Sequence, residues 1–114
     1  MTTLAAIKRK AAEKLAITTV GQAISSQVDS QMGAAYEETY YELDELDLVT
    51  WAVDADIPTK VADYVADIMA WKRADVYATP DIYARCQQRY SIAERNIKRV
   101  ISEKYQSTDE NEDF

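Results

Sequence analysis

The sequence predicts an all-α fold, a bundle of about four helices, on the strength of three observations. Glycine and proline occur only twice each in 114 residues, which leaves little room for the many turns of an all-β fold. Apolar residues recur at spacings of three and four over long stretches. The apolar share of 47% suits one modest core in a chain that buries about two thirds of its unfolded surface. We therefore expect one helical domain over residues 1–105 and a separate tail over 106–114.

The first helix is expected over residues 3–17, with Thr2 or Thr3 as its N-cap. Its apolar stripe is formed by Leu4, Ile7, Ala11 and Leu15. This helix is short and rich in alanine, so its stability must come from packing against other helices. A loop around Gly21 follows.

The second helix is expected over residues 26–46, with Ser26 as N-cap and Asp29 in the first turn, where a negative charge is favourable. Its apolar stripe contains Val28, Met32, Ala35, Tyr36, Tyr40, Leu43 and Leu46. The opposite face is acidic and carries Glu37, Glu38, Glu42, Asp44 and Glu45. Tyrosine has a large apolar ring and a polar tip, so the tyrosines suit either the rim of the core or an interface.

Residues 47–57 lose the helical period, and we expect an extended connector there. Its β-prone run around Trp51 is too short to form a sheet by itself. Trp51 is expected to dock onto the helices, although such a connector also offers an edge to another chain.

The third helix is expected over residues 58–77, with Pro58 at its first position, where the missing N–H is tolerated. Its apolar stripe is the widest in the chain, which predicts that this helix is central. Pro80 disfavours helical angles at Thr79 and so ends it.

The fourth helix is expected over residues 80–105, with Thr79 as N-cap and Pro80 at the first position. A helix of this length spans roughly 37 Å, more than a compact domain of this size needs, so one end is expected to project. The polar, acidic tail 106–114 is expected to be disordered until it binds a partner. Its last residue, Phe114, is either an anchor or a frayed end.

Charge is distributed unevenly along the chain, whose net charge is −7. The segment 29–75 is acidic, whereas the fourth helix carries a basic set, Arg85, Arg89, Arg95, Lys98 and Arg99. Such alternation predicts faces of opposite sign that meet within the bundle or between copies. Binding of phosphates by the basic set is a weaker interpretation, because the domain as a whole is acidic.

The residue types argue against an enzyme. There is no histidine, which removes the commonest general base and metal ligand. A lone cysteine, Cys86, cannot form a zinc site, lies within an apolar stripe and is expected to be an inert core residue. One cysteine also suits a reducing compartment. No stretch approaches the roughly 18 apolar residues that a membrane span needs. We expect no cofactor, no metal and no membrane contact.

The chain resembles the small helical head-to-tail connector (adaptor) proteins of tailed bacteriophages. The resemblance covers roughly residues 4–105 and rests on size, helix order and scattered positions. The similar parts are the opening helix 5–15, the acidic, tyrosine-rich second helix, Trp51, Asp56-Ile57-Pro58 and Ala74-Asp75-Val76-Tyr77. In that family a Leu-Gly pair commonly closes the first helix, whereas Leu15 is followed here by Ala16.

This resemblance implies a structural virion protein at the head–tail junction. Such proteins form a ring, typically a dodecamer, that joins the portal to the tail or to the next connector and continues the channel for genomic DNA without binding it specifically. It implies that Glu37, Glu38, Glu42 and Glu45 face the channel. It also implies a subunit or portal interface formed by Trp51, Arg85, Arg89, Arg95, Lys98, Arg99, Tyr105 and Phe114. The alternative is a cytoplasmic acidic helical regulator or inhibitor that acts by protein–protein binding.

Overall fold

The computed structural model describes residues 1–19 and 22–112, with side chains up to Ser102. Over these residues the chain forms four helices and no strand, which confirms the all-α prediction. The helices are α1 Leu4–Lys14, α2 Ser26–Glu45, α3 Thr59–Tyr77 and α4 Pro80–Glu112.

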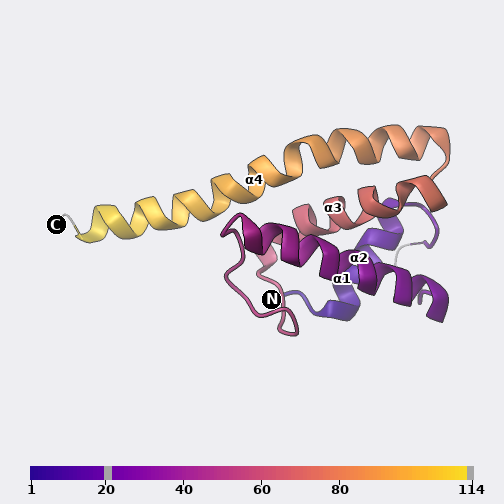
Figure 1. Cartoon of the computed structure of the whole chain (residues 1–114), viewed down its shortest axis with the longest axis horizontal. Helices are drawn as coiled ribbons and strands as arrows, with labels where there is room; N and C mark the ends of the chain where they lie inside the picture. The colour runs from indigo at the N-terminus through magenta and orange to yellow at the C-terminus, as the bar shows by residue number, and fades with distance from the viewer. Residues whose placement is uncertain (20–21, 113–114) are drawn as a thin grey trace.

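Helix α3 occupies the centre, as its wide apolar stripe predicted. It packs against α1 and α2 on one side and α4 on the other (Figure 1). Its buried residues include Val65, Ala66 and Met69, and the main core also takes in Ile7, Met32 and Ile97 from the other three helices. Small alanines on α1 and α3 let the helix backbones approach closely while their neighbours fill the spaces between them.

Helix α1 begins as predicted and ends earlier than predicted. The Thr3 hydroxyl accepts a hydrogen bond from the N–H of Ala6. At the other end the chain turns at Ala16, which has a φ of 59°, so the helix stops at Lys14 instead of residue 17. Ile17 N–H bonds to Ala12 C=O and Ala16 N–H to Glu13 C=O, the two bonds of a Schellman motif.

Helix α2 is capped one residue earlier than predicted. The hydroxyl of Ser25, not that of Ser26, accepts the N–H of Val28. Two adjacent serines carry the same capping signal, so the sequence alone does not choose between them. The helix ends in a second Schellman motif at Asp47, with a φ of 58°, and Leu48 folds back into the core.

The starts of α3 and α4 both involve proline. Pro58 lies just before α3 and its carbonyl accepts the N–H of Ala62, so it is the N-cap and not the first helical residue. Thr79 is the N-cap of α4, as predicted, because its carbonyl accepts the N–H of Tyr83 and the helix begins at Pro80.

Helix α4 continues to Glu112, beyond the predicted end at residue 105. Residues 106–112 contain no glycine or proline and form the last turns of α4. That the tail is disordered until it binds a partner stays a prediction. The prediction of a projecting end is confirmed, because α4 runs past the other three helices (Figure 1) and the molecule measures 51 × 27 × 25 Å.

The connector 46–58 is anchored at two points. Trp51 is buried with 8% of its surface exposed, which confirms that it docks onto the helices. Near the other end, Thr2 and Ile57 exchange backbone hydrogen bonds of 2.8 and 2.7 Å. This one-residue bridge brings the N-terminus to the start of α3.

Two apolar residues near helix ends are exposed, and one of them, Leu46, belongs to the apolar stripe predicted for the second helix. Leu46 is 46% exposed and Val76 is 73% exposed. Both lie at helix ends, where neighbouring helices no longer cover the apolar face. The periodicity identifies the buried face of a helix but not how far along it the cover extends.

Candidate functional site

The outer face of α2 carries a compact acidic patch. Its residues all lie on the side away from the core and are exposed: Glu37, Glu38, Tyr41, Asp44 and Glu45. Tyr41 lies at the centre, since positions three and four residues away on either side share its helical face. We call this set the acidic patch.

Two of the acids predicted to face a channel are paired within the subunit. Arg73 Nη2 lies 2.8 Å from Glu38 Oε2, and Lys72 Nζ lies 2.6 Å from Glu42 Oε1. The basic partners of these two acids therefore come from the last part of α3. Among the described side chains, Glu37, Asp44 and Glu45 have no such ion pair.

Helix α4 carries the opposite charge on its exposed surface. Ile92 is flanked three residues away by Arg89 and Arg95, and seven residues away by Arg85 and Arg99. All five are exposed, and we call this set the basic patch. Lys98, predicted with the arginines, lies on another face and pairs with Glu94 at 3.1 Å.

No carboxylate among the described side chains lies within ion-pair distance of Arg85, Arg89 or Arg95. Faces of opposite charge were expected to meet within the bundle or between copies, and for these three arginines no ion pair forms within the subunit. Arg85 and Arg95 are exposed, whereas Arg89 reaches toward α1 and α3.

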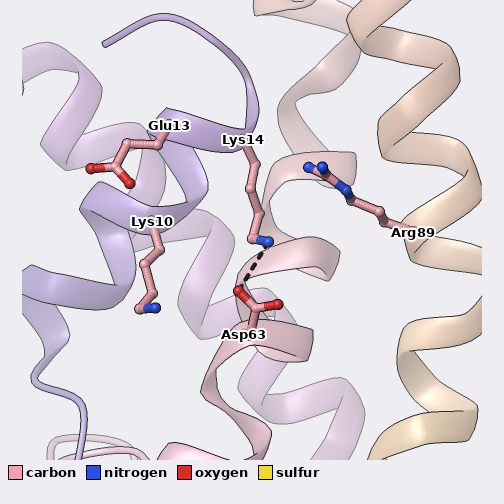
Figure 2. Close-up of a pocket in the computed structure, with 5 residues that line it drawn as sticks. All are labelled: Lys10, Glu13, Lys14, Asp63 and Arg89. Atoms are coloured by element: carbon pink, nitrogen blue, oxygen red, sulfur yellow. Dashed lines mark ion pairs between the residues drawn. The ribbon is translucent and has the colours of Figure 1, made fainter. Parts of the chain in front are cut away.

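One arginine of the basic patch also borders a shallow pocket of about 260 Å³ where α1, α3 and α4 meet. Figure 2 shows Lys10, Glu13 and Lys14 of α1, Asp63 of α3 and Arg89 of α4 around it. Lys14 Nζ lies 3.0 Å from Asp63 Oδ1. Three cations and two carboxylates leave the rim close to neutral, so it offers little charge to an ion from solution.

Below this pocket, Lys14 reaches a buried carboxylate. Its Nζ lies 2.8 Å from Asp67 Oδ1 as an ion pair without hydrogen-bond geometry. Burial raises the pKa of Asp67 above its ordinary value, and the nearby Lys14 ammonium opposes this rise.

Cys86 is buried as predicted, and burial raises the pKa of its thiol, which keeps it in the unreactive neutral form.

The predicted interface residue Trp51 is used inside the subunit. Its indole N–H donates to the Tyr36 hydroxyl at 3.0 Å, and its carbonyl accepts a 2.7 Å bond from the Tyr40 hydroxyl.

The side chain of Tyr105 and all of Phe114 lie outside the described residues, so their predicted interface role stays a prediction. Nothing in the sequence had indicated which acids of α2 would be paired, because their partners lie some thirty residues away in the chain.

The arrangement offers binding surfaces of opposite charge on two different helices. Among the described residues, no three His, Cys, Asp or Glu side chains are grouped so as to hold a metal ion. Nor does any helix within the described residues combine the length and apolar character of a membrane span.

The chain was also compared with protein-family models, with curated proteins and with solved structures. None of the three comparisons finds a match.

Proposed function

We propose that the chain is a structural connector that forms a ring at the head–tail junction of a tailed bacteriophage. The observation that carries the proposal is the pair of unlike charged patches on an elongated subunit. In a ring, one face of each copy meets a different face of the next, and such a contact requires two different, complementary surfaces. The acidic patch on α2 and the basic patch on α4 supply this pair.

The projecting part of α4 supports the second half of the proposal, attachment to a portal. A helix that runs past its own domain has no packing reason to do so, because helical stability in proteins comes mainly from tertiary contacts. A partner that covers the projecting end would supply these contacts. In the proposed role, this partner is the portal.

The geometry at the end of α1 agrees with the resemblance on which the proposal draws. Connector proteins of this type commonly close their first helix with a Leu-Gly pair. Here Ala16 follows Leu15 and takes up a left-handed φ of 59°, the conformation for which glycine is favoured. The backbone thus has the turn of a Leu-Gly pair although the glycine is missing.

In the ring, the net charge of −7 would suit a channel wall, since a negative surface repels DNA phosphates and lets the genome pass. Glu38 and Glu42 are neutralised by α3, so Glu37 and Glu45 are the better candidates for residues that face DNA or a neighbouring subunit.

The second candidate function is an acidic regulator that binds a basic partner protein. The exposed acidic patch favours it, because such a patch steers association with a positively charged surface. A regulator of this kind needs no basic patch and no self-association.

Native mass spectrometry of the purified full chain, alone and mixed with the portal protein encoded in the same genome, separates the two functions. The connector should form a closed oligomer of many copies, or bind about one copy per portal subunit. A monomer that ignores the portal would contradict the connector and favour the regulator.

The projecting arm can be tested with the same mixture. Deletion of residues 106–114 should reduce portal binding while the circular dichroism signal of the remaining helices persists. Unchanged portal binding by the shortened chain would remove the assignment of this segment as the docking arm.

A further inference from the structure

We infer that the basic patch of one copy binds the acidic patch of the next, with Ile92 packed against Tyr41 at the centre of the contact. The inference rests on the proposed ring and names the two faces that would form it. Its partner is a second copy of this chain.

The two patches share one design with reversed charge. On α4, Ile92 is 46% exposed and has arginines three and seven residues away on both sides. On α2, Tyr41 is 54% exposed and has acids three and four residues away on both sides. Each patch therefore has an exposed, largely apolar side chain at its centre and charged residues around it. The surrounding residues are basic on α4 and acidic on α2.

An apolar centre with a charged rim is the usual anatomy of a protein–protein contact. The spacing allows the two helices to lie antiparallel with Tyr41 opposite Ile92. Glu37 then lies near Arg95, and Glu45 lies near Arg89. Arginine is suited to these pairs, because its planar guanidinium can bind a carboxylate through two hydrogen bonds.

The two patches do not meet within one subunit. Helix α3 lies between α2 and α4 (Figure 1), and among the described side chains no ion pair joins the acidic patch to the basic patch. Contact between them therefore requires two copies. Because each copy carries both patches, the contact can repeat from copy to copy until a ring closes.

Nucleic acid is a less suitable occupant of the basic patch. The protein carries 20 acidic against 13 basic residues, so DNA approaching α4 also meets the field of the acidic surfaces. A second copy of the chain offers an acidic surface of matching size with an apolar group at its centre, which a phosphate backbone does not.

A single contact of this kind is expected to be weak. Two helices that touch over about three turns bury less than the roughly 1,600 Å² of a standard stable interface. Ring closure gives every copy two such contacts, and the second forms at a high effective concentration. Association should therefore be strongly dependent on protein concentration and on salt.

Charge reversal in the full chain tests the inference. The double substitution R89E/R95E should weaken self-association by about 10-fold or more in light scattering at low salt, and E37R/E45R should do the same. In an equimolar mixture, every contact between one variant and the other joins opposite charges, and the combined four-fold variant joins opposite charges at all contacts. The combined variant should therefore recover most of the lost self-association.

The control is Lys98→Glu, which reverses one charge on the same helix outside the basic patch. It should leave self-association unchanged. Circular dichroism checks that every variant is folded, which is expected because all of the substituted side chains are exposed.

Cysteine cross-linking tests the central contact directly, even where association is weak. In a Cys86→Ser background, chains carrying I92C and chains carrying Y41C should form a disulfide-linked dimer when mixed and oxidised. Chains that carry I92C alone should link far less. No mixed cross-link, or self-association that survives both charge reversals, would overturn the inference.

These outcomes are distinct from those for the phage role. Patch-dependent self-association without portal binding would uphold the contact and contradict the portal function. If the chain binds the portal but its self-association is unchanged by charge reversal in either patch, the portal function would be upheld and the proposed contact contradicted.

Discussion

The indole N–H of Trp51 donates a 3.0 Å hydrogen bond to the hydroxyl of Tyr36 and so fastens the connector to α2. The ring of Trp51 also meets that of Tyr40 edge to face, with centroids 6.0 Å apart. Burial raises the pKa of Tyr36 above its ordinary value, so its hydroxyl stays neutral at physiological pH. This junction positions the segment that leads from α2 to the central helix.

Tyr36→Phe should lower the free energy of unfolding by about 1 kcal/mol, because a buried indole N–H loses its acceptor. Urea denaturation followed by tryptophan fluorescence measures this change. Tyr41→Phe is the matched control, since its hydroxyl is exposed, and its stability should equal that of the wild type. Equal stability of all three proteins would show that the Trp51–Tyr36 bond contributes nothing.

Asp67→Asn should change how stability depends on pH. The pKa of Asp67 is raised in the folded state above its ordinary value of 3.8, mainly by burial. The folded state therefore holds this proton more tightly than the unfolded state, and the wild type loses stability as pH rises through the folded pKa. The variant lacks this loss, so its unfolding free energy relative to the wild type should increase from about pH 4 upward.

Chemical denaturation at a series of pH values measures that difference. Asp63→Asn serves as the control, because it removes the exposed partner of the same lysine and should change stability by less than about 1 kcal/mol. A difference between Asp67→Asn and the wild type that does not vary with pH would contradict the assigned shift.

Ala16→Gly should stabilise the protein by up to about 1 kcal/mol. A left-handed φ costs alanine roughly 1–2 kcal/mol and costs glycine nothing, although glycine also gains freedom in the unfolded chain. Thermal unfolding should show a higher midpoint. The same change at Ala5, an exposed site within α1, should instead destabilise by about 1 kcal/mol, so the two variants should move in opposite directions.

Gly33→Ala should raise stability by about 0.5–1 kcal/mol, because alanine is the better helix former within α2. A Cβ added at Gly33 would lie 3.6 Å from Cε of Lys8, an ordinary contact with a flexible side chain. Thermal unfolding checks this too. A lower midpoint would show that Lys8, which pairs with Asp29 at 3.5 Å, cannot accommodate the extra methyl group.

Local sequence signals predicted much of this fold. The apolar stripes identified four helices and the central position of α3, because a helix buried on most of its surface must be apolar on most of its surface. Thr79-Pro80 located the start of α4. The end of α1 was misplaced, because Ala16 has no intrinsic preference for the left-handed turn that closes the helix there.

The ion pairs between helices could not be predicted from the sequence. Glu38 and Glu42 looked like any other exposed acids, until the packing of α2 on α3 brought Arg73 and Lys72 beside them. The bridge between Thr2 and Ile57 likewise joins single residues far apart in the chain, which leaves no periodic pattern to detect.

The sequence by itself determined the helical class, the order of the helices and the opposite charges of α2 and α4, since all three depend on residue type and spacing along the chain. Only the tertiary structure decided which charges are neutralised within the subunit and which remain available to a partner. The physical reason is that ion pairs and burial depend on distances between helices, and these are set by the packing of the whole core.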